Sequence, residues 1–202
     1  AVAPNDLPAF LTDPANLIYM RRESLERFSP DSLSLMEFET RRDYEVTERV
    51  YGDWPLMGEE TESWNIKLNN EFHFTNDRHR LNQQGRGLPF YEGKMIHQFD
   101  AFYAEPQFWI GKDKLADLSP DSAQQLSTYR VVHRRIARST DARTLISAIV
   151  PPNTACEVNA TVALITGSDG QAIKPFVCAL LNSLVLDYVL RYKVATTLNM
   201  FY

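Results

Sequence analysis

Asp77 and the triplet Glu92-Gly93-Lys94 are the residues whose types and spacing come closest to a catalytic pattern. Many nucleases hold a divalent metal ion with two carboxylates and place a lysine near the attacking water, in the order Asp…Glu-x-Lys. The same order often arises by chance in a chain with 26 acids and 21 bases. A metal-dependent nuclease that uses Asp77, Glu92 and Lys94 is therefore an alternative, and a structural or DNA-backbone role for these residues is favoured over it.

Other catalytic patterns are not found in the sequence. The histidines show no pair at metal-ligand spacing and no Cys-x-x-Cys accompanies them; they are His73, His79, His97 and His133. Ser139 and Ser147 have no partnered base at a recognisable spacing. The stretch GSDG at 167–170 lacks the third glycine of a dinucleotide fingerprint and predicts a hairpin turn. We therefore expect no catalytic residue, no metal and no cofactor in this chain.

An arginine-rich segment, RVVHRRIARSTDARTLISAIVPP, occupies residues 130–152 and carries five arginines with a single acid, Asp141. On a strand, Arg130 and Arg134 point to one face and Arg135 to the other. Guanidinium groups in and around a polar turn can bind phosphates or guanine edges. The alternative is a solvated surface on which Arg143 pairs with Asp141, an exposed ion pair worth ~0–1 kcal/mol.

Length and charge suggest two regions. A chain of 202 residues with 44% apolar residues can form one large domain or two small ones. Residues 1–62 contain fourteen acids and six bases, a net charge of −8, whereas residues 63–202 contain twelve acids and fifteen bases, a net charge of +3. We expect 1–62 to be an acidic helical segment and 63–202 a second domain. Such charge asymmetry can mark a nucleic-acid contact surface.

The compartment is predicted from cysteine usage and from the apolar stretches. Cys156 and Cys178 both lie in apolar runs, which is typical of reduced structural thiols in a reducing compartment. The first residues show no secretory signal. The most apolar stretch, 176–189, contains Asp187 and is shorter than the ~20 residues of a spanning helix. We expect a cytoplasmic protein without a membrane partner.

The pattern of apolar residues predicts an α+β fold. Thr40 as N-cap and Gly52 as C-terminal stop predict a helix between them. Alternating apolar side chains predict a strand over 64–74, and the polar stretch 75–87 is expected to be an exposed loop. Further strands are expected at 94–100, 106–110, 128–137, 143–150 and 157–166, a weak helix at 111–119 closed by Pro120, and the longest helix at 174–194. The strand at 143–150 contains a nearly unbroken apolar run, which is typical of a central strand. We predict a mixed, mainly antiparallel sheet with flanking helices and a long C-terminal core helix.

Four blocks of sequence resemble a known family. They are RFSPDSLSLMEF, LPFYEGKMIHQFD, YRVVHRRIARSTDARTLISAIVPP and LLNSLVLDYVLRYKVATTLNMFY, in this order. Together they resemble the C-terminal part of bacterial N6-adenine DNA methyltransferases, above all the fused restriction-modification enzymes (type IIG-like) whose methyltransferase half is of the Taq type. The resemblance spans approximately residues 28–202. It implies a target-recognition, or specificity, region that docks on double-stranded DNA and selects the sequence.

The resemblance also implies what accompanies this region. The catalytic half, with its S-adenosylmethionine site and its Asn-Pro-Pro-Tyr-like loop, would lie upstream in the same polypeptide and would be the second partner besides DNA. The chain lacks an initiator methionine and stops at Phe201-Tyr202, where the family pattern continues, so we expect an excised domain. An alternative is a protein-interaction module that docks on the catalytic half and binds DNA poorly.

Two sets of DNA-contacting residues are predicted. A basic surface is expected to neutralise phosphates and fix register; it comprises Lys94, His97, Arg130, His133, Arg134, Arg135, Arg138, Arg143, Arg191 and Lys193. The polar stretches 69–87 and 112–127 occupy the places of sequence-specific loops. Base edges are expected to be read from the first of them, since arginine suits guanine and amides suit adenine, by Arg78, Arg80, Asn82, Gln83, Gln84 and Arg86.

Overall fold

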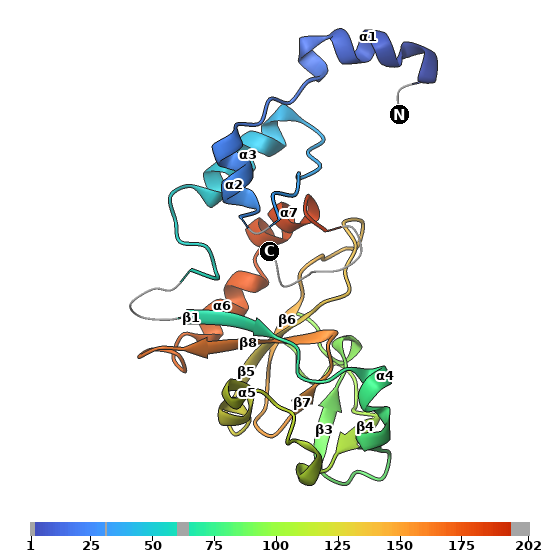
Figure 1. The fold of residues 1–202 in the computed structure, drawn as a ribbon, viewed down its shortest axis with the longest axis vertical. Helices are drawn as coiled ribbons and strands as arrows, with labels where there is room; N and C mark the ends of the chain where they lie inside the picture. The colour runs from blue at the N-terminus through green and yellow to red at the C-terminus, as the bar shows by residue number, and fades with distance from the viewer. Residues whose placement is uncertain (1–2, 31, 60–64, 195–202) are drawn as a thin grey trace. The chain divides into compact units, whose positions relative to one another are not determined.

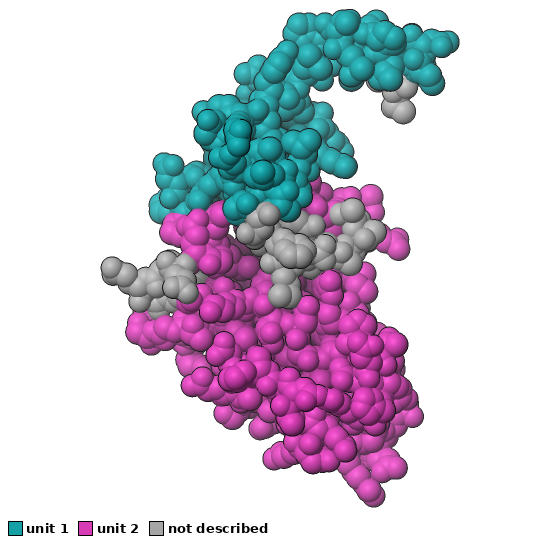
Figure 2. All heavy atoms as spheres, viewed as in Figure 1, with its two compact units in different colours: residues 1–54, 201 teal, residues 55–200, 202 magenta. Residues whose placement is uncertain are grey.

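The computed structural model describes residues 3–30, 32–59 and 65–194 (Figure 1). The chain divides after Trp54 into two compact units, which Figure 2 colours separately. The division expected from charge, between residues 62 and 63, falls in the segment 60–64, outside the described residues.

The first unit is helical. Its elements are η1 (Pro4–Asp6), α1 (Leu7–Thr12), η2 (Pro14–Asn16), α2 (Arg22–Phe28) and α3 (Arg41–Tyr51). The predicted helix at α3 is confirmed with both ends, because Thr40 and Asp43 form a reciprocal capping box and Gly52 ends the helix with a φ of 42°. Phe28 of α2 packs edge-on against Tyr44 of α3 with ring centroids 6.2 Å apart, and both rings are buried.

The second unit contains two four-stranded sheets. The first has the order β1-β8-β5-β6 and is antiparallel throughout, with β1 (Asn65–Asn69), β8 (Ala160–Thr166), β5 (Arg130–Arg134) and β6 (Ser147–Val150). The second has the order β2-β4-β3-β7, with β2 (Leu81–Asn82), β4 (Phe108–Ile110), β3 (Leu88–Tyr91) and β7 (Ala155–Cys156). Only the β3–β7 pair of these sheets is parallel. The mixed, mainly antiparallel α+β fold is therefore confirmed.

The remaining elements of the second unit are short helices that flank the sheets. They are α4 (Phe74–Asp77), η3 (Arg78–Arg80), η4 (Gly93–Met95), η5 (Lys112–Lys114), α5 (Pro120–Gln125), α6 (Lys174–Leu181) and α7 (Leu184–Arg191). Of these, α6 packs against β5 and β6.

Alternation along β5 builds two layers of core. Val131 faces the apolar cluster formed with Val177 and Leu181 of α6, and the neighbouring Val132 faces the cluster that contains Met95 and Ile96. Successive side chains of a strand point to opposite faces, and both valines are fully buried. β5 is thus covered on both sides, whereas β6, predicted to be central, lies at the sheet edge.

The strand predicted over 64–74 ends earlier than expected. β1 pairs with β8 only as far as Asn69, while Phe72 forms an isolated parallel bridge with Glu157 and Phe74 begins α4. The chain leaves the sheet where Glu71 turns its carboxylate inward to Arg130. Trp64 lies outside the described residues.

Three other local predictions were wrong. The stretch 75–87 contains most of α4, then η3 and β2, where a plain loop was expected, and 94–100 contains part of η4 and a tight turn in place of a strand. In the stretch 111–119 the structure has only the short η5. Pro120 starts α5 behind the N-cap Ser119, because proline is favoured in the first turn of a helix.

The prediction of a single long C-terminal helix is also wrong, because the structure has two helices there, α6 and α7. The side chain of Asn182 bonds both the amide and the carbonyl of Ser147 as well as the carbonyl of Cys178 in α6, and Ser183 caps the start of α7. The GSDG stretch forms a turn, but this turn leads into α6 and closes no hairpin. Cys156 and Cys178 are free and buried, as predicted.

Candidate nucleic-acid interface

The first arginine of the predicted basic surface is sealed in the core. Arg130 and Glu71 form an ion pair in which both side chains are fully buried. Arg130 also donates to the carbonyl of Thr154, and the other oxygen of Glu71 accepts from the amide of Cys156 at 2.9 Å. The prediction that Arg130 neutralises phosphate is corrected, because its charge is already compensated inside the protein.

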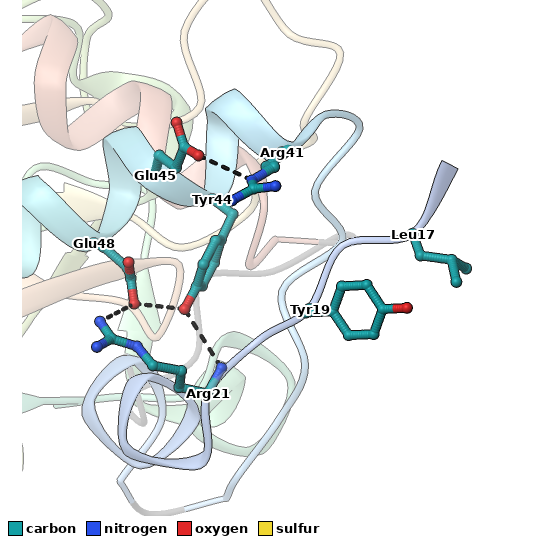
Figure 3. A pocket seen from close by; sticks show the side chains of 7 residues that line it. All are labelled: Leu17, Tyr19, Arg21, Arg41, Tyr44, Glu45 and Glu48. Carbon is teal, nitrogen blue, oxygen red and sulfur yellow. Dashed lines mark hydrogen bonds and ion pairs between the residues drawn. The ribbon is translucent and has the colours of Figure 1, made fainter. Parts of the chain in front are cut away.

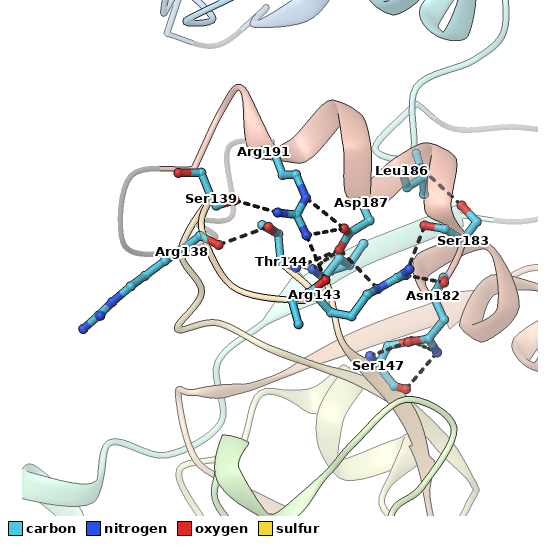
Figure 4. Close-up of polar contacts among 12 residues, drawn as sticks. Arg138, Ser139, Arg143, Thr144, Ser147, Asn182, Ser183, Leu186, Asp187 and Arg191 are labelled. Atoms are coloured by element: carbon cyan, nitrogen blue, oxygen red, sulfur yellow. Dashed lines mark hydrogen bonds and ion pairs between the residues drawn. The ribbon is translucent and has the colours of Figure 1, made fainter. Parts of the chain in front are cut away.

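Two further members of that surface are ion-paired with one buried carboxylate (Figure 4). Asp187 is 3% exposed and accepts from Arg191 at 3.0 Å, while the Nε of Arg143 lies 3.5 Å from its other oxygen. That oxygen also accepts from the amides of Thr144 and Leu145. Arg143 and Arg191 therefore clamp the loop before β6 onto α7, which corrects their assignment to DNA.

The alternative pairing of Arg143 with Asp141 is not formed either. Asp141 accepts from the backbone amide of Arg138 at 3.0 Å and closes the turn. The side chain of Arg138 extends away from the protein and is exposed (Figure 4). Arg138 remains available for contact with a ligand.

His133 is buried and Lys193 is half-buried. Burial lowers the pKa of His133, and its Nδ1 lies 3.1 Å from the carbonyl of Arg134. Burial also lowers the pKa of Lys193 to about 8. Arg135 is half-buried, and its backbone amide donates to Asn159. Because His133 is 5% exposed, its assignment to phosphate is corrected.

Arg134 differs from Arg130 and His133 of β5 because it is only half-buried. Its Nε and Nη2 donate to the carbonyl of Ile96, and its guanidinium lies 5.9 Å from the ring centroid of Tyr103. Burial lowers the pKa of this half-buried guanidinium, partly offset by Tyr103. Among the described residues, no carboxylate pairs with Arg134.

Arg134 lines a small pocket of about 230 Å³ whose walls are Gly93, Lys94, Arg134, Ile136 and Asn159. A Cβ at Gly93 would collide with the carbonyl of Asn159, so only glycine allows this close approach. Lys94 is 59% exposed and pairs with Glu92 at 3.1 Å. The structure thus brings together two predicted phosphate contacts, Lys94 and Arg134, that are 40 positions apart in the chain.

The two predicted base-reading stretches meet at one end of the second sheet. Leu81 and Leu88 both pair with Ile110, so the β2–β3 turn lies beside the residues that follow β4. Gly87 makes this possible with a φ of 108°, because a Cβ there would collide with the carbonyl of Ile110. We call this end the tip; its exposed polar residues are Gln83, Gln84, Arg86, Lys112, Asp113 and Lys114, and Lys114 pairs with Asp113 at 3.4 Å.

The other predicted base-reading residues are held by neighbours. The guanidinium of Arg78 lies 4.5 Å from the ring centroid of Phe108, although the residue remains exposed. Arg80 pairs with Asp77 and Asp117. The side chain of Asn82 donates hydrogen bonds to the carbonyls of Arg86 and Trp109 and so fixes the conformation of the β2–β3 turn.

An aromatic loop, residues 97–104, was missed by sequence reasoning, which assigned its first part to a strand. It exposes Phe99, Phe102 and Tyr103 at 64%, 73% and 58%. Phe99 has a φ of 62°, a left-handed conformation that costs a non-glycine residue on the order of 1–3 kcal/mol. The ring of His97 lies 4.9 Å from that of Tyr103. Three aromatics within five positions of a polar sequence were the signal available.

The residues of the nuclease alternative serve local structure. Asp77 accepts from the amide of His73 at 2.7 Å and pairs with Arg80. Glu92 precedes η4 and pairs with Lys94. In the part of the chain that the structure describes, no group of three or more histidine, cysteine or acidic side chains is placed to hold a metal ion.

The first unit has a pocket of its own, of about 290 Å³ (Figure 3). At its base, Glu48 accepts hydrogen bonds from Ser24, Tyr44 and Arg21. Burial raises the pKa of Glu48, but these hydrogen bonds outweigh it and lower the pKa to about 2. The carboxylate is therefore a structural anion that joins α2 to α3.

Comparisons with family models and with curated proteins give no relatives. No protein-family model matches the chain, and no curated protein is significantly similar to it. Within the described residues, each helix is too short or too polar to cross a bilayer.

Proposed function

We propose that this chain is a double-stranded DNA recognition module. The observation that carries the proposal is the tip, where the β2–β3 turn and the residues after β4 present amides and cations together. Side chains on an exposed turn can reach base edges in the major groove, where amides pair with adenine and arginine pairs with guanine. Lysines beside such a turn neutralise flanking phosphates and hold its register.

Different residues of the tip have different roles. Gln83, Gln84 and Arg86 read base edges, and Lys112 and Lys114 contact the backbone. The module acts next to the S-adenosylmethionine-dependent, adenine-specific methyltransferase portion of a restriction-modification enzyme in the cytoplasm. That portion supplies the catalytic chemistry, and this chain supplies the choice of sequence.

A salt series with matched variants tests the proposal. Anisotropy of a labelled mixed-sequence duplex is measured between about 50 and 200 mM salt, where each neutralised phosphate contributes roughly 0.9 to the slope of log affinity against log salt. Lys112→Ala and Lys114→Ala are each expected to reduce the slope by about that amount. Lys67→Ala removes an exposed lysine from β1 and serves as the control.

Sequence preference is measured separately by selection from a randomised duplex library. Arg86→Ala and Gln83→Ala are expected to relax the preference at individual base pairs, since each good base contact discriminates by about 1–3 kcal/mol. Binding that does not depend on salt, or a Lys112→Ala slope equal to that of Lys67→Ala, would contradict the proposal.

A second candidate function is docking on a protein, and the first unit favours it. η1, α1 and η2 bury none of their residues, while Leu11, Tyr19 and Trp54 are 53%, 75% and 74% exposed. Large apolar side chains that are left exposed are the groups that a protein contact buries. Deleting residues 1–16 should leave the fold and DNA affinity unchanged but weaken association with the methyltransferase portion, measured by size-exclusion chromatography. Loss of DNA binding in the deletion would assign these residues to DNA.

A further inference from the structure

Among the described residues, no carboxylate pairs with Arg134, and in this it differs from Arg130, Arg143 and Arg191. Arg130 pairs with Glu71, and Arg143 and Arg191 share Asp187. Arg134 is half-buried and donates its hydrogen bonds to a neutral carbonyl, that of Ile96. A half-buried guanidinium that is paired with no carboxylate favours an anion from outside.

The pocket that contains Arg134 borders the aromatic loop. The guanidinium of Arg134 lies over the ring of Tyr103, 5.9 Å from its centroid, so a cation of the pocket neighbours an exposed ring of the loop. Phe102 and Phe99 expose further aromatic surface from the same loop. A charged pocket beside flat rings matches the two parts of a nucleotide, which are a phosphate and a planar base.

The aromatic loop is held in place, although its rings face solvent. The amide of Phe99 donates to Ser147 at 2.9 Å, that of Phe102 to the side chain of Asp100 at 2.7 Å, and that of Ala104 to Met95 at 3.2 Å. Ala101 is buried in the core between the sheets. The rings are therefore presented by an anchored backbone, which lowers the entropy lost when a ligand packs on them.

We propose that the pocket of Lys94 and Arg134, together with Phe102 and Tyr103, binds one unstacked nucleotide of DNA. The phosphate binds the two cations and the base stacks on the aromatic loop. This inference rests on the proposed function and adds a second contact, remote from the tip along β3. The role assigned to the aromatic loop, stacking on a base, is separate from the reading of base edges by the tip.

Bulged duplexes test the inference with the complete chain. The probes are a mixed-sequence duplex and the same duplex with one unpaired central adenine, which leaves the stack at little cost. Stacking of one base on an aromatic side chain should make the bulged duplex bind about tenfold more tightly. A 2-aminopurine at the bulge should lose fluorescence on binding.

Variants separate the two halves of the site. Phe102→Ala and Tyr103→Ala should abolish the tenfold preference and leave the paired duplex within about twofold. Arg134→Gln should weaken both duplexes and reduce the salt slope by about 0.9. Tyr129→Ala, which removes a ring of 60% exposure outside the loop, is the control. Thermal unfolding of each variant verifies that the fold is kept.

The outcomes distinguish the two proposals. Salt-dependent binding of the paired duplex with no preference for the bulge, or a preference that survives Phe102→Ala, overturns the nucleotide site alone. Absence of binding to either duplex overturns the proposed function and this inference together. Unchanged DNA binding in all loop variants with lost binding of the methyltransferase portion assigns the loop to a protein contact.

Discussion

Removing the charge of Glu71 is the sharpest test of whether the charge of Arg130 is compensated inside the protein. In Glu71→Gln the fully buried guanidinium of Arg130 loses its counter-ion. Breaking a buried ion pair from one side costs about 3–5 kcal/mol. At about 1.4 kcal/mol per factor of ten, the folded state should be disfavoured by roughly 150- to 4,000-fold.

The double variant Glu71→Leu with Arg130→Met separates charge from packing. Replacing both members by apolar residues removes the uncompensated charge and is often neutral. The amide of Cys156 and the carbonyl of Thr154 would still lose their partners, so a cost of about 1–3 kcal/mol should remain. The double variant should therefore be more stable than Glu71→Gln.

Urea unfolding followed by far-ultraviolet circular dichroism measures these differences. Glu26→Gln is the matched control, because it breaks an exposed pair with Arg22 and should cost at most a few tenths of a kcal/mol. If Glu71→Gln cost less than about 1 kcal/mol, the reasoning from burial would be refuted, since Arg130 would then be solvated enough to reach a phosphate.

Two more predictions concern the other buried or clustered carboxylates. Asp187→Asn should destabilise the second unit by about 3 kcal/mol and speed amide exchange at Thr144 and Leu145, and unchanged exchange would contradict the clamp. The pKa of Glu48 falls from 4.5 in an unfolded chain to about 2, so its stabilisation is complete above about pH 4.5 and is lost as the pH falls toward 2. Glu48→Gln should remove about 1 kcal/mol at neutral pH, because the exposed Arg21 is screened by solvent, and should flatten acid unfolding in that window; an identical acid profile would speak against it.

Local signals predicted those parts of the fold that depend on neighbouring residues. The helix α3 carries its own cap at Thr40 and its own stop at Gly52. β5 and β8 are rich in β-branched residues and were predicted close to their observed bounds. The order of the strands in the sheet could not be predicted from these local signals, since β6 is as apolar as a central strand and still lies at the edge.

The errors in the candidate site have a common physical cause. Whether an arginine is exposed depends on a partner that is distant in sequence, and Glu71 lies 59 positions before Arg130. The clamp of Asp187 on Thr144 spans 43 positions. The break before α7 likewise depends on Asn182 finding the backbone of Ser147. Spacing along the chain carries no trace of such contacts, so a cationic strand and a salt-bridged core strand look alike in sequence.

The tip has a consequence for how the proposed recognition can diverge. Gln83, Gln84 and Arg86 are exposed, and the turn that carries them is shaped by Asn82 and Gly87. Exchanging the exposed side chains therefore leaves the apolar clusters of both sheets intact. Under the proposed function, one scaffold acquires new target sites through a few substitutions, without a compensating change in its interior.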